Sequence, residues 1–251
     1  MGLLDAFDLS SEEIIKPGHI ASRLDKFPRV AVATFSDKVM ARVRAYPGAV
    51  EICRVWAGFG TPPICQITHN GVRIAVFQTL VGGAGAAVSL EEVIARGGER
   101  FVFFGSCGTL DSAVSSGKLI VPTAAYRDEG TSYHYAPAGD YIDVNTSDKL
   151  SKILGYLGLP HIKAKTWTTD AFFRETRKNM LARKSEGCLA VDQECASVMA
   201  VGQFRGVEIY QYLYAEDNLD SDKWERRGLG VVSLCEEEKY LRVALDIAAL
   251  V

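Results

Sequence analysis

The chain has 251 residues, of which 48% are hydrophobic and 24% charged, and its formal net charge is −3. This composition is that of a soluble globular protein, and the absence of long charged runs argues against nucleic acid or a membrane surface as partner. No apolar segment reaches the roughly 20 residues needed to span a bilayer, and the acidic N-terminus does not resemble a secretory leader. We therefore expect a cytoplasmic protein that binds a small molecule.

Apolar runs alternate along the chain with segments that carry helix signals. Residues 29–35 form a continuous apolar run, which is typical of a strand buried on both faces, and Ser36-Asp37 offers a helix N-cap directly after it. Asn70-Gly71 favours a hairpin between strands at 64–68 and 72–79. Further strands are expected at 50–56, 101–104, 118–126, 161–167, 187–191 and 208–214, and helices at 11–15, 89–96, 147–157, 195–200 and 232–250.

This alternation, together with the hairpin, predicts an α/β protein. We expect a three-layer α/β/α sandwich with a mixed central sheet. The sequence shows no repeat, low-complexity tract or linker, so residues 1–251 are expected to form a single domain. The six cysteines include no C-x-x-C pair and no histidine lies at ligand spacing, so we expect reduced thiols and no metal.

Polar or glycine-rich clusters follow several of the expected strands, where α/β proteins bind ligands. Asp192-Gln193-Glu194 interrupts an apolar run, and these acids need either a partner, such as a sugar diol, or a helix N-terminus to complement. Residues 81–87 are glycine-rich but lack the dinucleotide-binding and P-loop spacings. Gly105-Ser106-Cys107-Gly108 reads as a tight turn whose amides and hydroxyl either bind phosphate or only shape the turn. Asp217 lies directly beyond the last expected strand, at its carboxyl end.

The order of these motifs resembles the nucleoside phosphorylase superfamily, which contains the hexameric uridine and purine nucleoside phosphorylases. The resemblance extends from about His19 to the C-terminal helix. It implies that Glu194 binds the ribose hydroxyls, with Gln193 beneath the sugar where the family usually has methionine. It further implies that Phe172 stacks on the base and that Asp217, when protonated, hydrogen-bonds N7 of a purine.

The resemblance also implies a site for phosphate, which is the co-substrate in these enzymes; no other cofactor is implied. Ser106 matches the phosphate-binding hydroxyl, and Cys107 and Gly108 beside it are expected to contact substrate. Arg54 matches an arginine that crosses to the neighbouring subunit's phosphate, and Lys38 offers one further charge. His19 matches the histidine that reaches the neighbour's ribose 5′-hydroxyl.

These cross-subunit residues imply a homo-oligomer, at least a dimer and by resemblance a hexamer. The expected function is phosphorolysis of a nucleoside, preferably a purine ribonucleoside, in nucleoside salvage. Asp217 favours purine, and the Gln-x-Arg pair with which uridine phosphorylases hold uracil is not found after Phe172, although Arg177 is a substitute to consider. No role is assigned to Arg226 or Arg227.

Two of the family's phosphate-binding arginines are missing. Phe103 occupies the place of one, and the loop after the first strand reads Ser36-Asp37-Lys38 instead of the family's arginine-bearing loop. Asp37 lies where related nucleosidases carry the carboxylate that activates water, and the apolar Phe103 would tune it as a general base. A phosphate-independent hydrolase, a uridine phosphorylase and a non-catalytic nucleoside-binding homologue therefore remain as alternatives.

Overall fold

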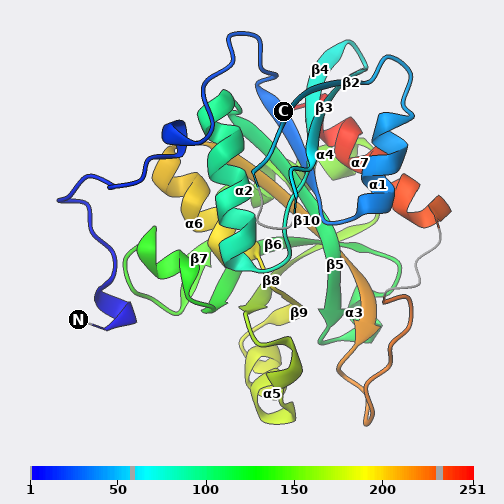
Figure 1. The fold of residues 1–251 in the computed structure, drawn as a ribbon. Coiled ribbons are helices and arrows are strands. Elements are labelled where there is room, and N and C mark those ends of the chain that lie inside the picture. Colours follow the sequence, from blue (N-terminus) through cyan, green and yellow to red (C-terminus); the bar gives the residue numbers. More distant parts are fainter. Residues whose placement is uncertain (1, 57–59, 230–233) are drawn as a thin grey trace.

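A computed structural model of the chain describes residues 2–56, 60–229 and 234–251, with side chains in the last segment described from 238. Within these residues one mixed sheet has the strand order β10-β6-β8-β9-β5-β1-β4-β3-β2, with β7 paired to β6 (Figure 1). The strands are β1 Val30–Thr34, β2 Val50–Arg54, β3 Pro63–His69, β4 Val72–Gln78, β5 Arg100–Thr109, β6 Leu119–Asp128, β7 Tyr141–Asp143, β8 His161–Thr169, β9 Cys188–Asp192 and β10 Glu208–Asn218.

Helices cover both faces of this sheet, and each face has its own apolar core. The α-helices are α1 Asp37–Arg44, α2 Gly83–Arg96, α3 Ser112–Ser115, α4 Ser147–Tyr156, α5 Arg177–Ser185, α6 Cys195–Arg205 and α7 Leu234–Ala248. The short 3₁₀ helices are η1 Leu3–Asp5, η2 Pro17–His19, η3 Thr131–His134 and η4 Phe172–Arg174. The predicted α/β fold with a mixed sheet is confirmed.

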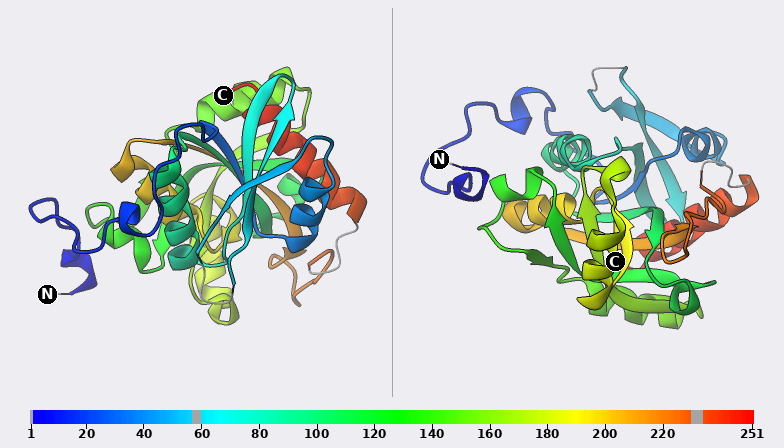
Figure 2. Two further views of the ribbon diagram at one scale, coloured as in Figure 1. Left: turned by 45° about the horizontal axis from the view of Figure 1, so that its top comes forward. Right: turned by 90° about the horizontal axis from the view of Figure 1, so that it is seen from below.

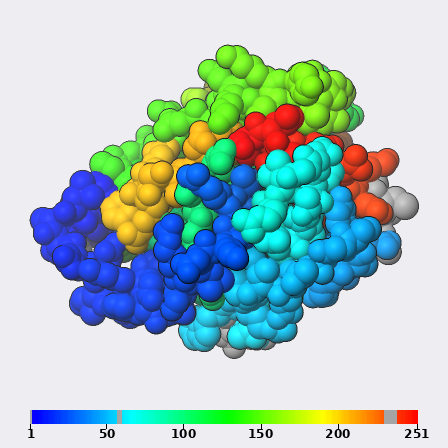
Figure 3. Space-filling model, turned by 90° about the horizontal axis from the view of Figure 1, so that it is seen from above, coloured from blue at the N-terminus to red at the C-terminus, as the bar shows by residue number. Residues whose placement is uncertain are grey.

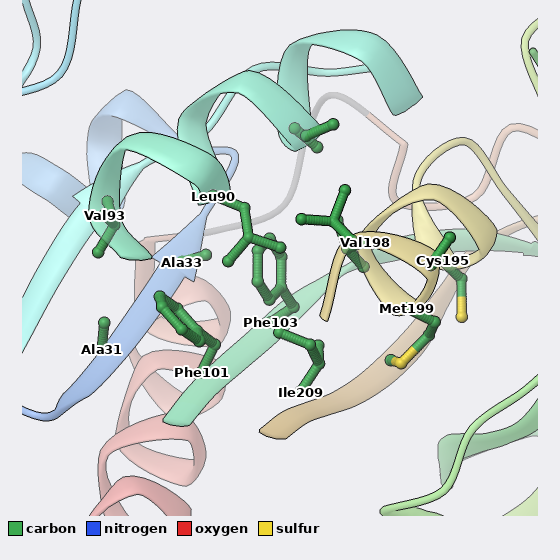
Figure 4. Close-up of a cluster of buried hydrophobic side chains, with 14 of the residues drawn as sticks. Ala31, Ala33, Leu90, Val93, Phe101, Phe103, Cys195, Val198, Met199 and Ile209 are labelled. Atoms are coloured by element: carbon green, nitrogen blue, oxygen red, sulfur yellow. The ribbon is translucent and has the colours of Figure 1, made fainter. Parts of the chain in front are cut away.

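Helices α2 and α6 pack on one face of the sheet through small and aliphatic residues. Figure 4 shows Leu90 from α2 and Val198 from α6 meeting Phe103 and Ile209 from the strands below them. Phe103 is fully buried and packs edge-on against Phe77. The side chain in the place of the family's arginine therefore belongs to the core.

Pairing between strands far apart in the sequence closes part of the sheet into a ring. Strand β5 pairs in parallel with β1 and with β10, and its last two residues pair with β9. Strand β10 also pairs with β6, and β8 pairs with both β6 and β9. The ring is therefore formed by strands β5, β10, β6, β8 and β9, each paired with the next. The carboxyl ends of β1, β5 and β10 meet at the same edge.

Three local predictions were wrong. Residues 11–15 form bends, not a helix; a five-residue helix cannot offset its nucleation cost without packing, and this segment runs along the outside of the molecule (Figure 2, left). The helix predicted over 89–96 begins at Gly83, because Gly82 at φ +89° allows the chain to turn directly from β4 into the helix. The supposed turn at Gly105–Gly108 is strand, because β5 continues to Thr109 along β10.

Several strand ends were also placed wrongly; β8 and β10, for example, continue to Thr169 and Asn218, past their predicted ends at 167 and 214. Strand β6 continues to Asp128, where its pairing with β8 extends it past the predicted end at 126. Strand β2 ends at Arg54, two residues before the predicted end. The Asn70-Gly71 hairpin is confirmed, with both residues at positive φ. The predicted last helix is confirmed over Leu234–Ala248; residues 232 and 233 lie outside the described residues.

Candidate active site

A cavity of about 410 Å³ opens at the carboxyl ends of β1, β5, β9 and β10. The arrow of β5 in Figure 1 points towards this edge. The residues that line the cavity are Thr34–Lys38, Val81, Phe104–Gly108, Phe172, Glu175, Val191–Glu194, Gln211, Leu213, Tyr214, Glu216, Asp217 and Leu229. The structure therefore brings together all but two of the predicted site residues: Lys38, Ser106, Cys107, Gly108, Phe172, Gln193, Glu194 and Asp217.

His19 and Arg54 are the two predicted residues that do not line this cavity. His19 lies in η2, where its Nδ1 accepts the Lys16 N–H at 3.3 Å. Arg54 ends β2, and its guanidinium pairs with Glu51 and donates to the Thr61 carbonyl. Figure 3 shows the blue N-terminal segment lying along α6, at the outside of the molecule, and an ion pair joins Glu13 to Arg205 there. Within one chain, neither residue reaches the cavity.

Glu194 stands at the N-terminus of α6 and is held by backbone and burial. Its Oε1 accepts the Gly82 N–H at 2.6 Å, and the residue is 8% exposed. Burial, and then the neighbouring Asp192, raises the pKa of Glu194 to about 8. The carboxyl is therefore mostly protonated at neutral pH in the free protein, and hydroxyl donors from a ligand would favour its ionised form.

Asp192 has a structural place beside Glu194. Its Oδ2 accepts the backbone N–H groups of Glu194 and Cys195, and its Oδ1 accepts the hydroxyls of Thr166 and Thr168. These four bonds fix the first turn of α6. Of the two acids in the Asp-Gln-Glu motif, Asp192 thus complements the helix N-terminus, and both acids line the cavity.

Asp217 lies near the end of β10, just after a bulge that shifts its register against β5. It is 3% exposed, and its Oδ2 accepts the indole N–H of Trp224 at 2.7 Å. Burial raises its pKa, which favours the protonated form. Gly108 is its partner on β5, and a Cβ there would come within 2.5 Å of Leu219, 2.8 Å of Val191 and 3.2 Å of Asp217 Oδ1, so only a glycine allows these side chains to pack this closely on β5.

The predicted phosphate-binding residues Ser106 and Lys38 line the same cavity. Ser106 is on β5 and Lys38 in the first turn of α1, and Asp37 lines the cavity beside Lys38. Phe35, Phe104 and Tyr214 are further aromatic residues that line the cavity, and Tyr214 pairs with Ser106 across β10 and β5. The expectation that Phe103 stands beside Asp37 was wrong, because alternation along β5 turns Phe103 into the core.

Carboxylates outnumber cations in this cavity. Among its described lining residues only Lys38 carries a cationic side chain, whereas six carry carboxyls: Asp37, Glu175, Asp192, Glu194, Glu216 and Asp217. No described group of three or more His, Cys, Asp or Glu could hold a metal ion. Such a lining suits a ligand that presents hydroxyl and N–H donors or develops positive charge.

Sequence reasoning missed Glu175, Gln211 and Glu216. Gln211 is 1% exposed, and its Oε1 accepts no hydrogen bond from the described residues. Gln211 could have been noticed in the sequence as the one amide within an expected strand of aromatic and aliphatic residues. A buried amide requires hydrogen-bond partners, so its presence there indicates a site. Glu175 had no such signal, since it follows η4 in a polar segment.

Glu194 is expected to make the free protein less stable as the pH rises from about 4.5 to about 8. Glu194 has a pKa near 8 in the folded protein and 4.5 as its ordinary value. Its contribution is thus complete below pH 4.5 and lost as the pH rises through 8. Between pH 5.5 and 8.5, Glu194→Gln should lose roughly 3 kcal/mol less than the wild type, measured by urea unfolding. The exposed Glu12→Gln is the control; equal losses in all three proteins would contradict this pKa.

Arg177, which was considered as a substitute, and Arg226 and Arg227, to which no role was assigned, are not among the residues that line this cavity. Arg177 donates to the carbonyls of Leu219 and Ser221, Arg226 donates to the Leu229 carbonyl, and Arg227 pairs with Glu225. Arg177 instead borders an adjoining cavity of about 330 Å³.

Among the helices that the structure describes, none is long and apolar enough to cross a membrane.

Comparison with known proteins gives a consistent picture. The family described as the phosphorylase superfamily matches residues 29–230. A guanosine phosphorylase of Halorubrum lacusprofundi is 27% identical over 165 residues, which cover 62% of this chain and 66% of that protein. A uridine phosphorylase of Thermococcus kodakarensis is 34% identical over 109 residues, covering 42% and 39%. The chain thus matches about two fifths to two thirds of these relatives' length.

The fold also resembles that of solved structures. The purine nucleoside phosphorylase of Toxoplasma gondii, in complex with immucillin-H, superposes with a TM-score of 0.73. That match covers 88% of this chain and 90% of the other, at 19% sequence identity. At 19% identity, this likeness shows a shared fold alone.

Proposed function

We propose a function from the premise that this chain belongs to the phosphorylase superfamily: it cleaves the N-glycosidic bond of a ribonucleoside with phosphate, preferring a purine. One observation carries the proposal. Phe172, Glu194 and Asp217 line the same cavity as Ser106 and Lys38. A stacking ring, a group for the ribose hydroxyls, a buried acid for the base and anion-binding groups are the parts that this reaction needs.

The proposed reaction passes through a sugar with cation-like charge while the base leaves with negative charge. Glu194 in its ionised form accepts hydrogen bonds from the ribose hydroxyls and orients the sugar. Asp217 in its protonated form donates to the departing base, and the Trp224 indole fixes the carboxyl. Phosphate, held by the Ser106 hydroxyl and the Lys38 ammonium, then bonds to the sugar carbon as the bond to the base breaks. The products are free base and ribose 1-phosphate.

The phosphate-binding residues support a further part of the proposal, a homo-oligomer. One ammonium is little charge for a dianion next to Asp37, and Arg54 stands half-exposed on the outside of its own chain. We propose that Arg54 and His19 enter a neighbouring subunit's cavity, in at least a dimer and by family resemblance a hexamer. We further propose that residues 1–251 act as one domain, in the cytoplasm, in nucleoside salvage.

The shortage of cations also favours a second candidate, a phosphate-independent nucleosidase. Here Asp37, beside Lys38 in the first turn of α1, would take a proton from water as it attacks the sugar. The base and ribose contacts would be the same in both reactions. The two differ only in the nucleophile.

The test is base release from inosine, adenosine, guanosine and uridine with and without inorganic phosphate. Phosphorolysis predicts turnover that requires phosphate and yields ribose 1-phosphate. Equal turnover without phosphate, yielding free ribose, would replace it with the nucleosidase and make Asp37→Asn the next variant. Binding of these nucleosides without any turnover would point to a non-catalytic binding protein.

A further inference from the structure

Glu129 is a buried acid that the proposed reaction does not use. It directly follows β6 and is 6% exposed. Its Oε2 accepts the Ser197 hydroxyl at 2.6 Å and the Ser132 N–H at 3.0 Å, and its Oε1 accepts the Ser132 hydroxyl. Arg127 donates to the oxygen of that hydroxyl from Nε at 2.8 Å. The Glu129 carboxyl therefore joins the loop after β6 to the first turn of α6.

Ser197 is the residue through which this network meets α2. Helices α2 and α6 lie side by side on one face of the sheet (Figure 1). A Cβ on Gly83, the first residue of α2, would come within 2.2 Å of Ser197 Oγ and 3.4 Å of Glu129 Oε2. A side chain has no room at this position. The backbone of α2 therefore begins in direct contact with the hydroxyl that Glu129 binds.

The residue before this contact binds Glu194. Gly82 is the N-cap of α2, and its N–H donates to Glu194 Oε1 at 2.6 Å. A displacement of the α2 start from Ser197 would move this N–H as well, because Gly82 and Gly83 are adjacent in the chain. The network around Glu129 and the Glu194 carboxyl are thus connected through two residues of backbone.

Plain packing could hold the two helices together at a lower cost. Burying a carboxyl and a guanidinium costs free energy, and apolar side chains of similar volume would avoid that cost. Hydrogen bonds, however, fix the distance and the angle between the groups that they join, which apolar contacts do not. A buried network at this place therefore favours a role in setting position.

We propose that Glu129 is a positioning residue: through Ser197 it holds the start of α2 where the Gly82 N–H meets Glu194. The consequence for catalysis rests on the proposed function, in which Glu194 orients the ribose. Glu129 acts without contacting the substrate, since it is not among the residues that line the cavity of about 410 Å³.

The position of the Gly82 N–H can be measured through the titration of Glu194 in the free protein. Burial raises the pKa of Glu194 to about 8, and the bond from Gly82 opposes this rise. Asp192 and Asp170 are the charged groups that raise it further, and replacing a serine changes neither. Ser197→Ala should therefore raise the pKa of Glu194 by about half a pH unit or more. The measurement is a carbon NMR titration of isotope-labelled glutamate carboxyls, in which Glu194→Gln identifies the signal by removing it.

Ser89→Ala is the matched control. Ser89 lies on α2 and is also fully buried, but its hydroxyl donates to the Gly85 carbonyl within its own helix. Its loss should leave the pKa of Glu194 unchanged. An increase as large as that in Ser197→Ala would overturn the inference, because it would show that any loosening of α2 has the same effect.

Two variants of Glu129 test the acid itself. Glu129→Leu removes the acceptors and should raise the pKa of Glu194 as Ser197→Ala does. Glu129→Gln should keep the pKa near that of the wild type, because its carbonyl still accepts the Ser197 hydroxyl. A Gln variant with the same pKa as the Leu variant would overturn the inference. Should the Leu variant not fold, Ser197→Ala against Ser89→Ala decides.

Activity gives a second measurement, which separates this inference from the proposed function. In Ser197→Ala the rising limb of kcat/KM should move to higher pH, and kcat/KM at pH 7 should fall about three- to tenfold. The titration needs no substrate, so a raised pKa supports the inference even if the wild type has no turnover, which would reject only the proposed reaction. Normal turnover with an unchanged pKa in Ser197→Ala would overturn the inference and leave the reaction standing.

Discussion

Replacing Asp217 by Ala is expected to lower kcat for nucleoside cleavage by about 10²- to 10³-fold while changing KM little. The carboxyl is 3% exposed, burial raises its pKa, and Trp224 holds one of its oxygens. In the proposed reaction its proton stabilises the leaving base only as the bond breaks. The loss should therefore appear in the chemical step, measured as kcat under saturating nucleoside and phosphate.

Two further variants make the Asp217 experiment specific. Asp217→Asn keeps the shape, accepts from Trp224 and can donate a hydrogen bond, but it cannot transfer a proton, so its kcat should lie between those of the wild type and the Ala variant. Asp222→Ala alters an exposed acid in the same loop and should leave kcat unchanged. An unchanged kcat in Asp217→Ala would rule out its role as the acid.

The second large effect is expected for Glu194→Gln, which should lower kcat/KM about 10²-fold. The Gln carbonyl can still accept the Gly82 N–H, and Asp192 still holds the first turn of α6. The variant thus keeps the local structure and loses the charged oxygen that would accept from the ribose diol. A variant with wild-type kcat/KM would remove Glu194 from the sugar site.

The pH dependence of kcat/KM tests the role of Glu194 independently. Sugar binding requires ionised Glu194, whose pKa in the free protein is about 8, so kcat/KM should rise with pH up to about 8. Glu175 titrates in the same range, so the profile is best measured in Glu175→Gln with and without Glu194→Gln. The rising limb should disappear when Glu194 is also replaced. Its persistence would assign the limb to another group.

Much of the fold and part of the site could be predicted from the amino-acid sequence. Strands that are buried on both faces need apolar residues at every position, so a run such as residues 29–35 can be recognised as a strand from the sequence. Asn70-Gly71 indicates the hairpin because few other residues accept positive φ. Carboxylates such as Glu194 and Asp217 stand out at the ends of such runs because acids are costly there. These signals are local, and they fixed the element types and the candidate residues at strand ends.

Only the tertiary structure decided which strands pair and which side chains share the cavity. Whether Gly105–Gly108 is a turn or a strand depends on β10, about a hundred residues later, which supplies hydrogen bonds that keep β5 extended to Thr109. The same alternation places Phe103 in the core on one face of the sheet and Phe104 in the core on the other face, where it also borders the cavity. Glu175 joins Asp217 only because ring closure brings η4 to the end of β10. Composition and periodicity record burial along one segment, whereas a shared cavity depends on contacts between distant segments, and so the sequence alone named Glu194 and Asp217 but not Glu175.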